Sequence, residues 1–335
     1  MSQKPDPPAA APFLANPQSA SKSHDLRFDM ALRGTGFSGE RAAVAPPIQT
    51  SNFAGNPASK ADALALARRD WILDVMERQR RVSPTAAALM RCEGLSGEQF
   101  RDHFYATSRP CLIAGAIADW PALGKWTPDY LRKAVGAAPV EFQGKREGAG
   151  DFELAKDRHK QVAPFTDYLD LIEQSLGNDA YITAYNNAAN QAAFAPLMAD
   201  IRPISHLLGP EPGMLWVGPA GTFTPLHFDL TNNLLIQITG RKRVLLVSPS
   251  QTRLMANRRH VFSDVHDLED AACMARHPQA QQVEPYIVTL EPGDMLFIPV
   301  GWWHQVRSLE FSVMMTCTNF LWLNDAYRDF PSDQG

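Results

Sequence analysis

Two histidines and one aspartate are of the types that bind a metal ion together. His227 and Asp229 lie in the run Thr224-Pro-Leu-His-Phe-Asp, and His304 ends the run Gly293-Asp-Met-Leu-Phe-Ile-Pro-Val-Gly-Trp-Trp-His. Two imidazoles and one carboxylate suit a facial iron(II) site, which leaves open coordination positions for a cosubstrate and oxygen. These three residues therefore predict an oxygenase.

The spacing of the three candidate ligands supports this interpretation. Side chains alternate across a β-strand, so a His-x-Asp pair on one strand projects both ligands to the same face. His304 can join them from a distant strand if the sheet is closed or folded around one cavity. The apolar run 295–298, opened by the turn signal Pro292-Gly-Asp, indicates a buried strand shortly before His304. The other histidines match no zinc pattern and are expected to have ordinary surface or buried roles.

The elements that must position these residues are predicted from the hydropathy pattern. Predicted strands cover 181–185, 214–217, 223–228, 234–238, 244–247, 286–290, 295–298, 303–306 and 311–320. Predicted helices cover 59–81, 97–105, 128–135 and 164–176. This series predicts a mainly β protein, a double-stranded β-helix (jelly roll) with flanking α-helices and a pocket at one end. The irregular stretch 250–282 is expected to cover a site or mediate contacts.

The chain divides into four predicted parts. Residues 1–58 are rich in Pro, Ala, Ser and Gly and predict a flexible segment. Residues 59–94 predict a helical extension, 95–323 the domain that carries the candidate ligands, and 324–335 a C-terminal tail. The helix 59–81 has apolar residues all around it, which indicates packing against the domain or another subunit and is compatible with a homodimer.

Length and composition narrow the class of protein. With 335 residues and 45% hydrophobic content, the chain can bury one sizeable core. A net charge of -4 gives no broad electropositive surface, so a nucleic-acid partner is not expected. No run predicts a membrane span or a secretory signal, and four scattered cysteines suit a reducing compartment. We therefore expect a cytoplasmic enzyme without a membrane partner.

Several separate motifs resemble a known family. Residues 95–323 resemble the cupin-type JmjC oxygenases, especially the branch of the factor-inhibiting-HIF asparaginyl hydroxylase. The matching runs are 224–229, the hairpin 232–249, the run 293–304, and upstream Arg109-Pro-Cys-Leu-Ile-Ala-Gly with 119–121 and 126–131. This resemblance implies Fe(II) as the cofactor and 2-oxoglutarate and O2 as cosubstrates. It also implies hydroxylation rather than demethylation, on a protein or peptide side chain rather than a small molecule.

Lys242 is the candidate cation for the distal carboxylate of 2-oxoglutarate. A dianionic cosubstrate needs such a cation, and the resemblance places the family's cosubstrate lysine at this position. A solvated residue beside Arg241 and Arg243 is the alternative. Strand alternation puts Lys242 on one face with Val244 and Leu246, which favours an inward orientation.

The resemblance also implies polar partners for the cosubstrate. It assigns this role to Thr224, Asn233, Tyr181 and Asn319, with Tyr185 as a substitute for Tyr181.

Two other function classes remain open. One is a cupin metalloenzyme that does not use 2-oxoglutarate, such as an isomerase or another dioxygenase, which would not need the cation of Lys242. The other is a non-catalytic cupin module for binding or dimerisation, which would not bind a metal tightly. The sequence selects no individual substrate.

Overall fold

The computed structural model describes residues 59–84, 86–150 and 152–331. The predicted flexible segment 1–58 and the end of the predicted tail, 332–335, lie outside the described residues. All elements below belong to one unit of the chain, Gln49–Gly335.

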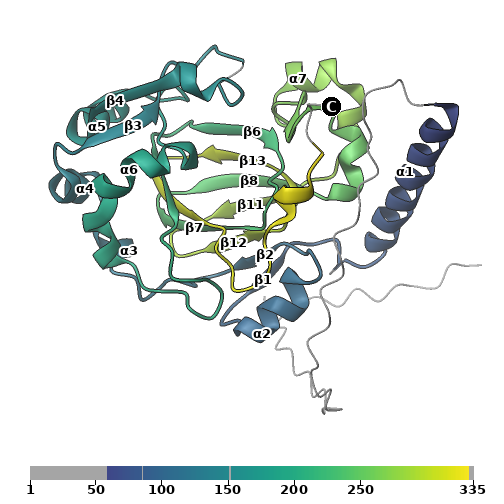
Figure 1. Cartoon of the computed structure of the whole chain (residues 1–335), viewed down its shortest axis with the longest axis horizontal. Coiled ribbons are helices and arrows are strands. Elements are labelled where there is room, and N and C mark those ends of the chain that lie inside the picture. Colours follow the sequence, from purple (N-terminus) through teal and green to yellow (C-terminus); the bar gives the residue numbers. More distant parts are fainter. Residues whose placement is uncertain (1–58, 85, 151, 332–335) are drawn as a thin grey trace, which may run out of the picture. The chain divides into compact units, whose positions relative to one another are not determined.

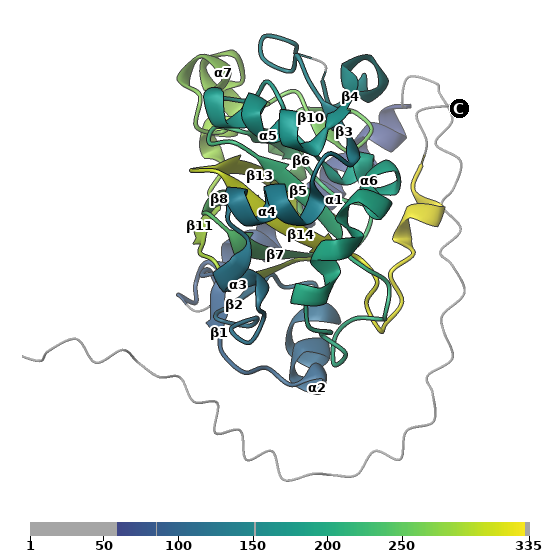
Figure 2. The same ribbon diagram turned by 90° about the vertical axis from the view of Figure 1, so that its left-hand side faces the viewer.

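Two six-stranded sheets face each other in the described part of the chain (Figures 1 and 2). The first has the order β1-β2-β12-β7-β14-β5, with bounds Met90–Cys92, Cys111–Ile113, Met295–Ile298, Asn233–Thr239, Ser312–Cys317 and Met214–Gly218. The second has the order β11-β8-β13-β6-β10-β9, with bounds Tyr286–Leu290, Lys242–Val247, Trp303–Ser308, Phe223–His227, Phe262–Ser263 and Asn257–Arg259. Only β1 and β2 pair in parallel among these strands. The two antiparallel sheets confirm the predicted double-stranded β-helix.

The space between the sheets is filled by apolar side chains from both of them. Leu235 of β7 and Met314 of β14 meet Val244 and Leu246 of β8 and Val306 of β13 in one buried cluster. Each such side chain contributes roughly 1.5–3 kcal/mol when fully buried, so this cluster is a main force that holds the two sheets together.

Helices cover the outer face of the first sheet (Figure 2). They are α3 (Ala122–Lys125), α4 (Pro128–Val135), α5 (Phe165–Gln174) and α6 (Asn187–Phe194). Their apolar residues pack in one cluster with Ile236 and Met315 of the sheet. The strand β7 is consequently buried on both faces, which explains why its sequence is almost continuously apolar. The small sheet of β3 (Pro139–Gln143) and β4 (Lys160–Pro164) lies beside these helices.

The helix α1 (Lys60–Arg80) is anchored to the domain through a buried carboxylate. Glu77 accepts hydrogen bonds from Arg80 Nε at 3.1 Å, Arg81 Nε at 3.0 Å and Ser250 Oγ at 2.7 Å. Much of its apolar surface stays exposed, including Leu64, Trp71, Ile72 and Met76. This exposed surface is compatible with the predicted homodimer, which stays a prediction. Within the described residues, no helix is both long and apolar enough to cross a bilayer.

The stretch 250–282 is more ordered than the sequence predicts. It contains a 3-10 helix (Pro249–Leu254), the short strands β9 and β10, the helix α7 (Ala271–Arg276) and a second 3-10 helix (Pro278–Gln282). The strand β10 pairs with β6 through Phe262 and His227. This pairing brings the stretch against the candidate ligands.

The predicted strand 181–185 does not form. Tyr181 and Ile182 make isolated bridges to Gln143 and Val217, and a 3-10 helix (Ala184–Asn186) follows. The cause is a local side-chain bond, because Asn186 Oδ1 accepts from the backbone N–H of Thr183 at 3.2 Å. Such bonds compete with strand pairing.

Gly240 forms the tight turn that joins β7 to β8. Its φ is +68°, and a Cβ there would lie 2.0 Å from the carbonyl oxygen of Phe311. We expect Gly240→Ala to lower the free energy of unfolding by at least about 2 kcal/mol, from backbone strain and this clash. Urea denaturation measures the change. Gly124→Ala is the matched control, because Gly124 is helical with no atom within 4 Å of such a Cβ. Equal stability of the two variants would contradict this prediction.

Candidate metal and cosubstrate site

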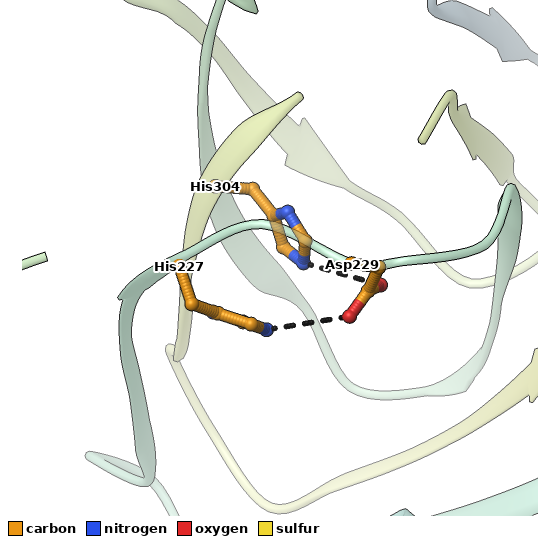
Figure 3. Close-up of side chains that lie close together, drawn as sticks. All are labelled: His227, Asp229 and His304. Carbon is orange, nitrogen blue, oxygen red and sulfur yellow. Dashed lines mark ion pairs between the residues drawn. The ribbon is translucent and has the colours of Figure 1, made fainter. Parts of the chain in front are cut away.

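Three side chains meet at one end of β6 and β13, as the sequence predicts. His227 is the last residue of β6 and pairs directly with His304 of β13. Asp229 lies two residues beyond the end of β6, in irregular backbone. The strand ends before Asp229, but its carboxylate lines the same cavity as His227, as the His-x-Asp spacing predicts. Figure 3 shows the three side chains pointing toward one another.

The distances in this triad leave room for an ion. Asp229 Oδ1 lies 3.7 Å from His227 Nε2, and Asp229 Oδ2 lies 3.7 Å from His304 Nε2. These separations are too long for hydrogen bonds. One potential ligand atom from each residue lies within 4.8 Å of the other two.

Backbone carbonyls fix the tautomers of both imidazoles. His227 Nδ1 lies 2.8 Å from the carbonyl oxygen of Pro225, and His304 Nδ1 lies 3.0 Å from that of Trp302. A carbonyl can only accept, so each Nδ1 carries the proton of the neutral ring. Both Nε2 lone pairs then face the Asp229 carboxylate, which is the form that a metal ion requires.

The charges of the triad agree with this arrangement. Burial, together with the neighbouring His227, lowers the pKa of His304 to about 4, so its ring is neutral at pH 7. Burial would raise the pKa of Asp229, but His304 and His227, a hydrogen bond from Asn233 and the charge of Lys156 hold it below the ordinary value. The triad thus presents a neutral His304 ring beside an ionised Asp229 carboxylate.

The triad lines a cavity of about 290 Å³. The charged side chains on its wall, among the described residues, are Asp229, Glu153 and Lys156. Its uncharged polar wall is rich in threonine hydroxyls, from Thr183, Thr224, Thr231, Thr316 and Thr318. Its apolar wall includes Met214, Trp216, Leu235, Phe262, Val306 and Met314.

Lys242 lies behind this wall and points inward, as strand alternation predicts. It is fully buried with Val244 and Leu246, and its ammonium donates to the hydroxyl of Tyr181 at 2.7 Å. Tyr181 lines the cavity, whereas Lys242 is not among the described lining residues. Burial lowers the pKa of Lys242 to about 7. A buried ammonium with one hydrogen-bond partner among the described residues is costly, so an anionic ligand nearby would stabilise it.

Thr224 and Asn233 also reach the cavity wall. Asn233 Nδ2 donates to Asp229 Oδ2 at 3.0 Å and so orients the carboxylate toward the rings. Its Oδ1 is buried and has no partner in the described part of the chain. An unpaired buried acceptor of this kind is consistent with a site that binds a further group.

The structure places Asn319 and Tyr185 differently from the other predicted residues. Asn319 Nδ2 donates to the carbonyl oxygens of Gly209 at 2.8 Å and Glu211 at 3.0 Å, away from the cavity lining. Thr316 and Thr318 line the cavity, whereas Cys317 and Asn319 are not among its described lining residues. Tyr185 lies on the wall and is 41% exposed. The tyrosine that contacts Lys242 is Tyr181.

Arg146 is a buried residue near the site that the sequence does not reveal. Its Nη2 donates to Glu153 Oε1 at 3.1 Å and to the carbonyl oxygen of Phe223 at 2.9 Å. Its guanidinium lies 5.3 Å from the centre of the Tyr181 ring. Arg146 therefore contacts two residues of the cavity lining, Tyr181 and Glu153. A single arginine in a loop carries no sequence signal for such a role.

Comparison with known proteins identifies the family. The model of the cupin-like domain matches residues 97–325, which is more than half of the chain. The chain belongs to the cupin-like domain family. The matched range contains the triad, Lys242 and the whole cavity wall.

The names of individual relatives of this cupin-like chain describe several activities. It is 30% identical over 259 residues to "Lysine-specific demethylase JMJ30" of Arabidopsis thaliana, covering 73% of this chain and 57% of the relative. It is 30% identical over 246 residues to the human "tRNA wybutosine-synthesizing protein 5", covering 67% of this chain and 75% of the relative. It is 27% identical over 242 residues to the human "Bifunctional peptidase and (3S)-lysyl hydroxylase JMJD7", covering 61% of this chain and 76% of the relative.

The chain spans little more than half the length of several of these relatives. In four of the matches the alignment covers between 52% and 57% of the relative's length. The names of these relatives include a lysine demethylase, a lysyl hydroxylase and a tRNA wybutosine-synthesizing protein, so family membership leaves the substrate open.

Proposed function

We propose that the chain is an iron(II)- and 2-oxoglutarate-dependent oxygenase that hydroxylates a protein or peptide side chain. The observation that carries the proposal is the convergence of His227, Asp229 and His304 on the wall of one cavity. The same wall includes Tyr181, which is the hydrogen-bond partner of the buried Lys242.

The donor set fits iron(II). Two imidazole nitrogens and one carboxylate on one side of an ion are typical of non-haem iron(II) oxygenases. Both Nε2 atoms are available because each Nδ1 is bonded to a carbonyl, and Asn233 holds the carboxylate. When bound, the iron with 2-oxoglutarate and O2 would supply the oxidising power to replace a substrate C–H hydrogen by a hydroxyl group.

The residues beside the triad would hold the cosubstrate. Burial raises the pKa of Tyr181, so its hydroxyl keeps its proton while it accepts from Lys242. The hydroxyl can therefore donate to a carboxylate, and the ammonium supplies the compensating charge. Thr224 and Asn233 add a hydroxyl and an amide on the same wall. The apolar side chains around them exclude water from the reacting groups.

One observation favours a cupin metalloenzyme that does not use 2-oxoglutarate as the second candidate. Lys242 lies behind Tyr181 and is not among the described residues that line the cavity. An enzyme of that class would need the metal ligands and not the lysine. A variant of a metal ligand should therefore inactivate either kind of enzyme, whereas a variant of Lys242 should affect only an enzyme that uses 2-oxoglutarate.

The deciding experiment is an anaerobic titration with iron(II) and 2-oxoglutarate, followed by the metal-to-ligand charge-transfer absorption. We expect the band in the unmodified protein, its loss in His227→Ala, and its weakening or loss in Lys242→Ala. His206→Ala is the matched control because His206 is exposed and does not line the cavity. A folded protein that binds iron but gives no band would move the assignment to the second candidate. Failure to bind iron would favour a non-catalytic module.

The affinity for 2-oxoglutarate should depend on pH through Lys242. The pKa of about 7 means that the ammonium loses its proton as pH rises above neutrality, while a bound dicarboxylate needs the charged form. We expect the Kd for 2-oxoglutarate to rise, approaching about tenfold per pH unit, between about pH 7.5 and about pH 8.5. Titrations of the charge-transfer band measure it. Lys242→Arg is the control, because arginine stays charged, and the same slope in both proteins would contradict the prediction.

A further inference from the structure

The charged side chains on the cavity wall indicate the class of substrate, an inference that rests on the proposed function. Two of the three are carboxylates, Asp229 and Glu153, and the third is the ammonium of Lys156. Asp229 belongs to the triad. Whether a substrate's charge can be matched therefore depends on Glu153 and Lys156.

Glu153 is shared between two cations. Its Oε1 lies 3.1 Å from Arg146 Nη2, and its Oε2 lies 3.6 Å from Lys156 Nζ. The side chain of Arg146 is fully buried, and Glu153 is its carboxylate partner among the described residues. A buried guanidinium needs such a partner, so Glu153 is not available to a substrate. The three side chains together carry one excess positive charge.

Lys156 carries that excess charge at the accessible side of the wall. Its side chain is 35% exposed, compared with 12% for Glu153 and none for Arg146. Its Nζ lies 5.6 Å from the centre of the exposed Tyr185 ring. An anion that enters the cavity can therefore pair with Lys156 without displacing a buried ion pair.

We propose that Lys156 is a specificity-determining residue that pairs with a carboxylate of the substrate, so that the cavity accepts an aspartate or glutamate side chain of a peptide. The threonine hydroxyls of the wall can donate hydrogen bonds to the same carboxylate. A lysine or arginine side chain would meet the positive charge of Lys156, and both wall carboxylates would already be engaged. The cavity thus disfavours cationic substrates.

The charge pattern near the cavity favours an acidic peptide over a nucleic acid. Lys160 pairs with Glu141 at 3.3 Å, and Arg258 pairs with Asp264 at 3.2 Å. A nucleic-acid backbone needs several cations that are free to replace its counterions. Neutralised pairs do not supply them, whereas one carboxylate side chain needs one cation.

The test is affinity selection from a degenerate peptide library, with the protein loaded anaerobically with iron(II) and 2-oxoglutarate. Retained peptides are sequenced for the unmodified protein, for Lys156→Glu and for Lys133→Glu. Lys133 is exposed on α4 and gives the same change of charge away from the cavity. We expect Asp and Glu to be enriched about threefold, as one part-exposed ion pair allows, by the unmodified protein and Lys133→Glu. Lys156→Glu should lose this enrichment and retain Lys and Arg instead.

Each other outcome overturns the proposal. These outcomes are no acidic enrichment or the same enrichment in Lys156→Glu. A third is that the loaded protein retains polyuridylate, offered as a separate probe, in place of acidic peptides. The charge-transfer band is recorded on the same preparations. A band without acidic enrichment defeats the substrate assignment alone. A missing band defeats the proposed function, while the comparison of the two lysine variants still tests the charge preference.

Discussion

Replacing Asp229 with alanine is expected to abolish hydroxylation and to weaken iron(II) binding by at least about 100-fold. Loss of a residue that only supports a metal ligand costs 10–100-fold, so loss of a ligand should cost no less. The structure gives a second reason, because Asn233 Nδ2 would lose the carboxylate to which it donates at 3.0 Å. Iron(II) titration and turnover of 2-oxoglutarate measure the two effects.

The matched control for this variant is Asp119→Ala, which removes an exposed carboxylate away from the cavity lining. It should bind iron as the unmodified protein does. If Asp229→Ala kept iron affinity within about threefold of that value, Asp229 would not be a ligand.

Replacing Lys242 with methionine is expected to have opposite effects on binding and on stability. Binding of 2-oxoglutarate should weaken at least about tenfold, because the distal carboxylate loses its cation. The free energy of unfolding of the unliganded protein should rise by about 1–3 kcal/mol at neutral pH, because a fully buried ammonium is replaced by an apolar chain of similar length. Urea denaturation and 2-oxoglutarate titration measure the two quantities.

The stability gain should depend on pH in a defined direction. The pKa of Lys242 falls from 10.5 to about 7 on folding, so the unfolded chain binds more protons between these values. The unmodified protein therefore gains stability as pH rises through this range, and the penalty is complete below about pH 7. The advantage of Lys242→Met should shrink by about pH 9, whereas Lys133→Met should show no such trend. A pH-independent difference would mean that the ammonium is not the cause.

Much of the fold could be predicted because the central strands have clear hydropathy patterns. The strands β11 and β12 have the bounds that the sequence predicts, and β8 starts two residues earlier than expected. The strands β1 and β2 were not predicted because three residues carry too little pattern. Their pairing depends on β12, which is distant in the sequence. The helix α6 was not predicted because its Asn- and Ala-rich sequence has no strong amphipathic pattern.

The candidate site could be predicted where ligand chemistry determines the residue type. His227, Asp229 and His304 come together as the motifs indicate, although Asp229 lies just beyond the end of β6. The ion pair between Arg146 and Glu153 could not be predicted, because it forms only when the loop after β3 folds against β6. The orientation of Asn319 could not be predicted either. The family resemblance gave its role, but its side chain donates to the carbonyl oxygen of Gly209 instead.

The direct pairing of His227 with His304 has a consequence for how this domain could diversify. The hydrogen-bond ladder between β6 and β13 fixes the separation of the two rings, although a long insertion lies between them in the chain. The backbone pairs of this ladder include no residue of 250–282, although β10 within that stretch pairs with β6 at His227 and its Phe262 lines the cavity. Exchange of this stretch between related chains should alter the choice of substrate while the reactive centre is inherited intact.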